Sequence, residues 1–411
     1  MSRKTEPNLI VGLDIGTSKV VAMVGEAGPD GTMTVVGVGT HPARGLRKGV
    51  VVNIESTVES IRQAVDEAER SAGCKIHSVY AGISGSHIRG INSDGVTAIR
   101  HREVTPDDVD SVIEAARVVA IPADQQILHI LPQEFMIDGQ EGIQDPVGMA
   151  GVRLEARVHI VTGAISAAQN LIKCVQRCGL AVDDLILQPL ASSRAVLAPD
   201  DRDLGICLLD IGGGTTDLAV FTHGAIRHTA VLPIAGDQVT NDIAVAFRTP
   251  IPAAEAIKLQ YACCLKQWTR PDERVEVAGG GDRAVRAFSR YDLAEVVEPR
   301  YEEFFDMALA ELRRSGFEPL MAAGLVLTGG SSRIDGVVEL AEAVLHLPVR
   351  LGLPQQVAGL QDPQRHPGYA TAVGLLLLGN ESRPGRAGSS VRTTGRSGLW
   401  AWLKHWIQGN F

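Results

Sequence analysis

The sequence predicts an α/β fold made of two similar halves around a cleft, with a small α+β subdomain inserted in the first half. Two motifs predict the halves: L-D-I-G-T-S-K at Leu13–Lys19 and L-D-I-G-G-G-T-T-D at Leu209–Asp217 each join two apolar strands. The insertion is predicted by a gap of about eighty residues between the strand expected at Ser78–Ile83 and the helix expected to begin near Ser166.

Length and charge limit the class of protein. A chain of 411 residues exceeds one ordinary core, so roughly two to four domains are expected. The net charge of −9 argues against nucleic acid as the main partner of the folded body. The charge is uneven, because residues 382–411 carry five basic and no acidic side chains, which leaves −14 on the rest.

Cysteine usage and hydropathy predict a cytoplasmic chain without a transmembrane helix. The six cysteines form no C-x-x-C pair and no metal-type cluster with histidine, which is typical of structural thiols in a reducing compartment. The N-terminus lacks the apolar core of a secretory signal. The longest late apolar run, Ala372–Leu378, is too short to span a bilayer.

The two hairpins, Leu9–Val24 and Leu204–Phe221, form candidate phosphate loops. Glycine and threonine at each turn let backbone N–H groups and hydroxyls face an anionic oxygen. Asp14 and Asp210 end equivalent strands, so they are expected to face each other across the cleft, where they could hold a hydrated Mg²⁺. A single such turn is most often structural, but its repetition and the three glycines Gly212–Gly214 favour function.

Further elements of the first half follow from periodicity. Ser56–Ser71 is expected to be a helix opened by a Ser56–Glu59 capping box, with one apolar face made of Val58, Ile61, Val65 and Ala68. The insertion contains a helix capped at Thr105–Pro106 and a strand at Val152–Val161. Its histidines His129 and His159 lie in strand-like runs, where a lone histidine is more often packed or exposed than a ligand.

The second half contains two weaker candidate contacts for a nucleotide. Thr249–Ala262 reads as a helix with a Thr249 cap and an early proline, on which Glu255 and Lys258 share a face and could reach one ribose. The alternative is a surface ion pair between these two residues. Gly236, which opens the preceding helix, is a plausible phosphate contact.

A third glycine site ends the strand that begins at Leu325. Gly329-Gly330 precedes the helix expected at Val337–Leu345, and such a pair can lie flat against a purine or ribose. By itself it is a common turn between a strand and a helix.

The last thirty or so residues change in composition. Glu381–Gly398 is rich in Gly, Ser, Thr and Arg and lacks apolar periodicity, which predicts a flexible linker. Residues 399–411 then predict an amphipathic helix with one apolar side. That side consists of Leu399, Trp400, Trp402, Leu403, Trp406, Ile407 and Phe411.

Such a stripe could pack on the core, but the linker, the basic flank and the tryptophans favour the surface of an anionic membrane. A single short helix would bind there reversibly, and many copies on one polymer far more tightly.

Two D-x-G hairpins and a late T-G-G turn resemble the actin, DnaK and sugar-kinase superfamily, whose two ribonuclease-H-like halves clamp ATP and Mg²⁺. The resemblance is more specific than this superfamily. The chain resembles the FtsA family of bacterial division proteins over nearly its whole length, in the stretches that follow. These are G-L-D-I-G-T-S-K-V, R-G-L-R-K-G-V-V-x-x-I-E from Arg44, D-I-G-G-G-T-T-D, A-E-V-V-E-P-R-Y-E-E from Ala294 and Y-A-T-A-V-G-L-L from Tyr369.

The resemblance implies an actin-like fold and a set of nucleotide contacts. The first phosphate loop would be Gly16, Thr17, Ser18 and Lys19, and the second Gly212, Gly213, Gly214, Thr215 and Thr216, with Gly236 beside it. Gly329, Gly330, Ser331 and Arg333 would lie by the adenosine, with Glu255 and Lys258 on the ribose. Gln188 occupies the place where relatives put a residue that orients the attacking water. Because not all members keep a polar residue there, the protein is expected to be at most a slow ATPase.

The resemblance also implies the domain boundaries. Domain 1A would comprise residues 1–82 and 166–203, with subdomain 1C inserted at 83–165 and a return helix at 366–380. Domain 2A would comprise 204–232 and 305–365, with 2B at 233–304. The linker at 381–398 and the membrane helix at 399–411 would follow.

In this family, subdomain 1C contacts later division proteins and 2B binds the C-terminal peptide of FtsZ. Arg300 in E-P-R-Y-E-E could pair with that peptide's carboxylate, and the alternative is a pair with a nearby glutamate. The expected function is an ATP-binding protein that assembles like actin and anchors the FtsZ ring to the cytoplasmic face of the inner membrane at the septum. The enzymatic alternative is a metabolite kinase, and two further alternatives are a DnaK-like chaperone and a pilus-assembly relative.

Overall fold

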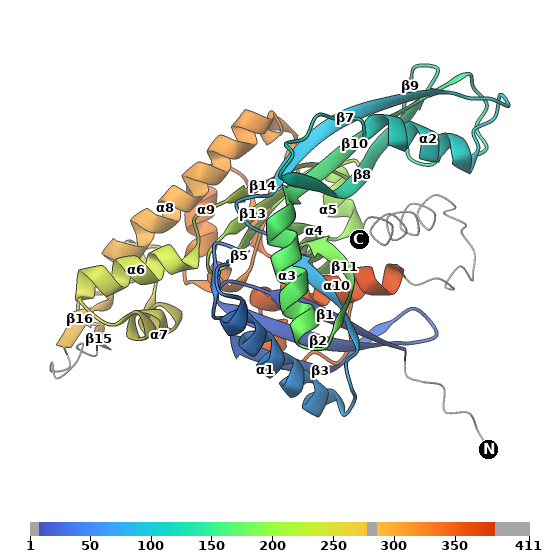
Figure 1. Ribbon diagram of the computed structural model, residues 1–411. Helices are drawn as coiled ribbons and strands as arrows, with labels where there is room; N and C mark the ends of the chain where they lie inside the picture. The colour runs from blue at the N-terminus through green and yellow to red at the C-terminus, as the bar shows by residue number, and fades with distance from the viewer. Residues whose placement is uncertain (1–7, 278–285, 383–411) are drawn as a thin grey trace.

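The computed structural model describes residues 8–277 and 286–382 (Figure 1). The first half is built on a five-stranded sheet in the order β11-β6-β1-β2-β3. Strand β2 pairs antiparallel with β1 and β3, whereas β6 runs parallel to β1 and β11. The bounds are β1 Leu9–Ile15, β2 Lys19–Ala27, β3 Met33–Pro42, β6 Ser78–Ile83 and β11 Ala181–Leu187. A small ribbon joins β4 Leu46–Arg47 and β5 Val50–Val51.

The second half repeats this plan in the order β14-β13-β12-β17-β18. Its first three strands form an antiparallel meander, and β17 then runs parallel to β12 and β18. The bounds are β12 Ile206–Ile211, β13 Thr216–Thr222, β14 Ala225–Leu232, β17 Leu325–Thr328 and β18 Val349–Leu351. The repeat predicted from the two D-I-G motifs is therefore confirmed at the level of whole sheets.

Helices cover both faces of the first sheet because its strands are buried on both sides. On β1, Val11 and Leu13 pack in one core with α1 and α3, whereas Ile10 packs in another with α4 and α10. The second core also takes Leu208 and Val326 from the second sheet, so α4 and α10 are shared by the two halves. The bounds are α1 Ile54–Ala72, α3 Ile165–Arg177, α4 Gln188–Val196 and α10 Ala370–Glu381.

The other face of the second sheet carries the remaining large core. Tyr301, Phe304 and Phe305 of the long helix α8 are fully buried there. The helices of this half are α5 Pro199–Leu204, α6 Gly236–Phe247, α7 Ile251–Tyr261, α8 Arg290–Ser315 and α9 Val337–Leu345. Short elements complete it: η1 Lys266–Trp268, β15 Arg274–Val277, β16 Arg286–Ser289, η2 Glu318–Leu320, η3 Gly330–Arg333, η4 Asp362–Arg365 and η5 Pro367–Tyr369.

The inserted subdomain is a four-stranded sheet, β7-β10-β8-β9, with α2 packed against it. It projects from the body in Figure 1, and β7 and β8 contact β14 of the second half. The bounds are β7 Arg89–Ala98, α2 Pro106–Ala116, β8 Gln125–Ile137, β9 Gln140–Ile143 and β10 Arg153–Ala164. As predicted, Thr105 caps α2 in a capping box with Asp108.

Two predicted helix caps are wrong. Helix α1 begins at Ile54, two residues earlier than expected, because the extended residue Asn53 caps it and its side chain accepts a bond from Ser56 N at 3.0 Å. The Ser56–Glu59 pair therefore lies inside the helix. Helix α7 is preceded by Pro250, which has no side-chain oxygen to offer, so Thr249 is not its cap.

Two expected segment limits also fall inside helices. Glu381 belongs to the last turn of α10, where Arg194 pairs with it at 2.5 Å, so the predicted linker does not include it. The limit expected between residues 304 and 305 lies in the middle of α8, because that helix is continuous from Arg290 to Ser315.

Candidate functional site

The turn of the first hairpin is closed by a bond from Gly16 N to Lys19 O at 3.0 Å. It leaves Thr17 and Ser18 at the tip, where Ser18 is exposed and Thr17 half-buried. Thr17 Oγ1 accepts a bond from Gly49 N at 3.1 Å, which holds the tip against the segment that follows β4. The predicted strand, turn and strand are confirmed.

The turn of the second hairpin has the same closure, from Gly212 N to Thr215 O at 2.9 Å. Gly213 O accepts a bond from Asp237 N at 2.7 Å, which ties the turn to the first residues of α6. The tips of the two turns lie against each other. A Cβ on Gly213 would lie 2.8 Å from Cβ of Ser18, and one on Gly214 would lie 2.7 Å from Oγ1 of Thr17. Only glycine leaves space between the two tips.

Three buried carboxylates lie behind these turns. Asp14 Oδ1 accepts a bond from Gln188 Nε2 at 3.1 Å, and Asp210 Oδ2 accepts one from Ser192 Oγ at 2.5 Å. Asp217 Oδ1 accepts a bond from the hydroxyl of Ser84. All three side chains are nearly inaccessible to solvent.

Burial and mutual repulsion disfavour the charged forms of these acids. Burial, and then the nearby charge of Asp210, raise the pKa of Asp14 to about 7. The same two causes raise the pKa of Asp217 to about 8, and burial raises the pKa of Asp210. The expected meeting of Asp14 and Asp210 is therefore observed as an electrostatic interaction, with Asp217 as a third member.

Lys19 supplies the positive charge closest to this cluster. Burial lowers the pKa of its ammonium, and the carboxylates of Asp14 and Asp210 oppose that shift. Its Nζ lies 3.7 Å from the centre of the Tyr369 ring, which comes from the segment before α10. The lysine therefore connects the first hairpin with the segment that precedes α10.

Lys258 and Glu255 of α7 lie beside the second turn. Their Nζ and Oε2 atoms are 2.7 Å apart, so the ion pair given as the alternative is present. It lies at the edge of the surface, because Lys258 is only 4% exposed and Glu255 is 35% exposed. Lys258 Nζ also donates to Gly236 O at 3.1 Å and to Thr240 Oγ1 at 2.9 Å. The pair is thus fixed at the opening of α6.

The late glycine pair approaches the same turn from β17. Gly329 has φ of +88°, and a Cβ there would lie 2.4 Å from Oδ1 of Asp210. Ser331 Oγ donates to Gly212 O at 2.9 Å. Arg333 is exposed, and its charge is the third cause, after burial and Lys19, of the pKa of His366 falling to about 4.

The structure thus gathers most of the predicted contacts around one site between the halves. The donor set fits a nucleotide with a hydrated Mg²⁺, because it combines carboxylates, hydroxyls, an ammonium and backbone N–H groups at glycine turns. In residues 8–277 and 286–382, no group of three or more His, Cys, Asp or Glu side chains is placed to hold a metal ion by itself.

Sequence reasoning missed Asp217, Ser84 and Tyr369 as members of this site. Asp217 could have been found, because it ends the D-I-G-G-G-T-T-D motif. Ser84 lies outside the motifs in sequence and gave no signal. Tyr369 begins the Y-A-T-A-V-G-L-L stretch, but nothing in that stretch indicated a contact with Lys19.

Arg300 lies on α8, away from these turns, and is paired within the chain. Its Nε is 2.6 Å from Asp242 Oδ2 of α6, and its guanidinium also contacts Glu303. The alternative of a nearby glutamate partner is therefore present, with an additional aspartate. Both insertion histidines are buried and hydrogen-bonded, as expected of packed side chains.

The sequence of this chain is 59% identical over 409 residues to the cell division protein FtsA of Pseudomonas aeruginosa, and the match covers 98% of each chain. The chain belongs to the FtsA family of cell division proteins. FtsA of Escherichia coli K12 is 47% identical over 420 residues, which cover all of both chains. Residues 207–374 match the family model described as cell division protein FtsA, and residues 85–162 match the SHS2 domain inserted in FtsA.

Solved structures show the same fold at low sequence identity. A type IV pilus biogenesis complex, PilM-PilN, is 19% identical with a TM-score of 0.66 and covers 90% of this chain and 98% of that one. MreB5 of Spiroplasma citri bound to ADP is 14% identical with a TM-score of 0.52 and covers 89% and 94%. The actin-like fold and the inserted subdomain expected for an FtsA chain are confirmed.

The predicted linker from residue 383 onward and the predicted membrane helix at 399–411 lie outside the described residues. Within the described part, no helix is both long and apolar enough to cross a membrane.

Proposed function

We propose that this FtsA chain binds ATP with Mg²⁺, assembles like actin and anchors the FtsZ ring to the cytoplasmic face of the inner membrane at the septum. The observation that carries the proposal is the meeting of the two glycine turns in front of Asp14, Asp210 and Lys19. Such an arrangement positions phosphates between two halves of the molecule.

Each part of the site has a role in this proposal. Thr17, Ser18 and the backbone of Gly212–Gly214 would contact phosphate oxygens, and Lys19 would balance their charge. Asp14 and Asp210 would hold Mg²⁺ through water, and the ion would neutralise phosphate charge. On the sugar and base, the contacts would come from Glu255, Lys258, Gly236, Gly330, Ser331 and Arg333.

Hydrolysis is proposed to be slow at most. The Gln188 amide nitrogen donates one N–H to Asp14 at 3.1 Å, so its second N–H and its oxygen are left to orient a water molecule. In this arrangement Gln188 would hydrogen-bond to the Asp14 carboxylate as well as to the water. The nucleotide would then act mainly as a structural ligand.

The proposed contacts with other molecules lie away from the nucleotide. Arg300 would receive an acidic peptide of FtsZ, but its pairs with Asp242 and Glu303 would compete for the same donors. The inserted subdomain would contact later division proteins. Residues 399–411 would bind anionic lipid, and self-assembly would multiply that weak attachment.

Calorimetric titration of ATP with Mg²⁺ tests the nucleotide part. Asp210→Asn should weaken binding at least about tenfold, because it removes a carboxylate from the ion's surroundings. Asp306→Asn, at an exposed position of α8, is the matched control and should bind like the parent. Equal affinity of all three proteins would contradict the assignment of this site.

Sedimentation with phosphatidylglycerol-containing vesicles in the presence of ATP tests the membrane part. The full chain should pellet with the vesicles, and a version ending at Gly398 should stay in solution. Equal pelleting of the two would rule out the proposed anchor while leaving the nucleotide site untouched.

A further inference from the structure

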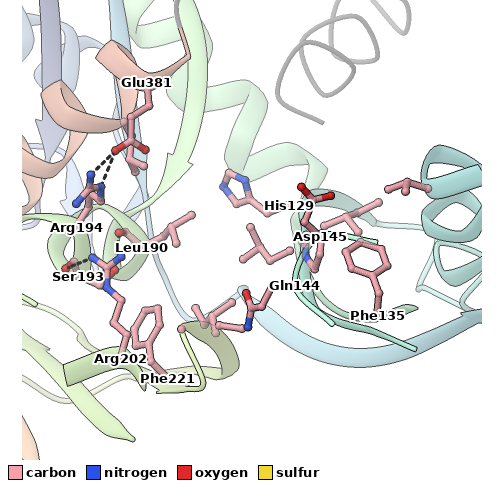
Figure 2. Close-up of a pocket in the computed structure, with 18 of the residues that line it drawn as sticks. His129, Phe135, Gln144, Asp145, Leu190, Ser193, Arg194, Arg202, Phe221 and Glu381 are labelled. Atoms are coloured by element: carbon pink, nitrogen blue, oxygen red, sulfur yellow. Dashed lines mark hydrogen bonds and ion pairs between the residues drawn. The ribbon is translucent and has the colours of Figure 1, made fainter. Parts of the chain in front are cut away.

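A cavity of about 360 Å³ lies where the inserted subdomain meets the rest of the molecule (Figure 2). Its walls come from β8 and the segment after β9 on one side, and from α4, α10 and the β13–β14 hairpin on the other. The residues that face each other across it include His129, Phe135, Gln144 and Asp145, opposite Leu190, Arg194, Phe221 and Glu381. None of the nucleotide contacts proposed above lines this space.

His129 gives the cavity an unused hydrogen-bond donor. The side chain is 1% exposed, and its Nε2 accepts the backbone N–H of Leu187 at 3.0 Å. The ring is neutral, because burial lowers its pKa to about 4, so its proton is on Nδ1. Among the described residues, Nδ1 has no hydrogen-bond partner. An occupant whose acceptor reached this buried donor would satisfy it and gain a hydrogen bond.

The rim of the cavity has an unpaired negative charge. Asp145 is exposed, and the bond its side chain makes within the described part of the chain is from Val147 N at 3.2 Å. Glu381, by contrast, is paired with Arg194. Leu131, Pro132 and Ile226 contribute apolar wall. The preferred occupant is therefore mainly apolar, with a cationic group at its edge and an acceptor at its buried end.

The chain itself supplies a segment of this kind at this place. Leu378 and Glu381 of the last turn of α10 line the cavity, and the described chain reaches its last residue, Ser382, next to them. The segment S-G-L-W-A-W-L-K-H-W-I-Q-G-N-F follows after the predicted linker. It contains three tryptophans, the cation Lys404 and the side-chain acceptors Gln408 and Asn410.

We propose that, in the absence of a membrane, the apolar side of residues 399–411 docks in this cavity. The cavity would then hold one or two large side chains, with Lys404 near Asp145 and an amide or backbone oxygen on His129. The same side chains cannot face lipid at the same time, so docking competes with membrane binding. This inference rests on the membrane role proposed above for the tail.

Because the linker keeps the tail close to the cavity, even a weak intrinsic affinity is sufficient for docking. A linker from Ser382 to Leu399 would span roughly 25 Å root-mean-square, which places the tail near the cavity at an effective concentration in the millimolar range. With an intrinsic dissociation constant of about 0.1–1 mM, the cavity would then be about half to nine-tenths occupied by the tail in one isolated molecule. Vesicles that bind many copies would displace it.

Tryptophan fluorescence of the full chain tests the proposal. Trp268→Phe, in η1 of the second half, leaves Trp400, Trp402 and Trp406 as the reporters. Two variants disturb the cavity in this background: Asp145→Lys reverses the rim charge, and Val147→Phe fills space. Glu103→Lys is the matched control, because it makes the same charge change at an exposed position of the same subdomain that does not line the cavity.

Without lipid, acrylamide should quench the parent and the control about twofold to tenfold less than either cavity variant. Asp145→Lys and Val147→Phe should also bind phosphatidylglycerol vesicles more tightly than the parent by a similar factor. Circular dichroism checks that each variant is folded, and Asp145→Lys lies on an exposed loop where folding is least at risk.

Equal quenching in parent and variants would overturn the proposal, as would protection that grows with protein concentration, since a second copy would then be the occupant. Failure of every full-length protein to bind vesicles is a different outcome. It would overturn the proposed membrane anchor even if the tryptophans were protected.

Discussion

Asp14, Asp210 and Asp217 hold more protons in the folded protein than in the unfolded chain near neutral pH. An aspartate whose pKa rises from 3.8 to about 8, as for Asp217, loses stabilisation between those two values as pH increases. Between pH 6.5 and 8.5 the buried histidines oppose this effect only in part, by about 0.4 kcal/mol each, because an unfolded histidine is already half neutral at pH 6.5. Burial lowers the folded pKa of His129 to about 4 and that of His159 to about 3, so both stay neutral in the folded protein over this range.

We therefore predict that the nucleotide-free protein without Mg²⁺ is less stable at pH 8.5 than at pH 6.5. Asp217→Asn should reduce that difference by about 1–3 kcal/mol, because the amide has no charge to lose. Urea unfolding at both pH values measures this. The exposed Asp306→Asn is the control and should leave the difference unchanged. A parent protein equally stable at both values would show that the acids are not buried as described.

Among helices, α10 is the element on which both sheets depend. It packs on β1 of the first sheet and on α4, and ten of its residues are buried. Close approach requires glycine at residue 374, where a Cβ would lie 1.8 Å from the carbonyl oxygen of Ala191. No side-chain rotation can relieve that contact, since both groups are backbone or directly attached to it.

Gly374→Ala should therefore destabilise the protein by about 1–3 kcal/mol, although alanine favours helices over glycine by about 1 kcal/mol. Thermal unfolding measures the change. Ala310→Gly on the exposed side of α8 shows the effect of helix propensity alone and should cost about 1 kcal/mol. A Gly374→Ala protein as stable as the parent would mean that α10 and α4 are farther apart than in the structure.

At the scale of elements, sequence patterns predicted what is local and missed what depends on distant contacts. The strand Ser78–Ile83 and the helix Val337–Leu345 have the predicted bounds, because apolar periodicity and flanking glycines define them. The start of α1 was misplaced, since S-x-x-E also occurs inside helices and Asn53 competes for the cap. Ser84 joined the site only because β6 lies beside β1 in the folded sheet.

The inserted subdomain belongs to the first half in sequence but is bonded to the second half in space. His159 Nε2 lies 2.9 Å from Thr229 Oγ1, and Gln133 Nε2 donates to Ile226 O at 2.9 Å. Both contacts are buried. A movement of the two halves about the nucleotide would therefore also move the insertion or break these bonds.

Thr229→Val keeps the shape of the side chain and removes its hydroxyl, which leaves His159 Nε2 without this partner. The protein should lose about 1–3 kcal/mol of stability, and amides of β7 should exchange hydrogen faster. Thr97→Val, on the part of β7 away from this contact, should change stability by less than about 0.5 kcal/mol. Unchanged exchange in β7 would show that the hydroxyl does not hold the insertion.

The proposed membrane attachment belongs to the scale of the assembled molecule, because one tail would be a weak anchor. Partial burial of seven apolar side chains at roughly 1 kcal/mol each must offset the ordering of a short helix.

Trp402→Glu removes one of these contributions and adds a charge that is costly in the bilayer interface, so single molecules should dissociate from vesicles. ATP affinity should stay within about twofold of the parent, because the proposed nucleotide site lies between the halves and does not include the tail. Sedimentation with vesicles at increasing protein density measures the membrane binding of both proteins. Parent binding should steepen as copies assemble, whereas Trp402→Glu should bind weakly at every density. A parent whose binding is as tight at low density as at high density would make the tail a sufficient anchor by itself, and assembly would then have no part in attachment.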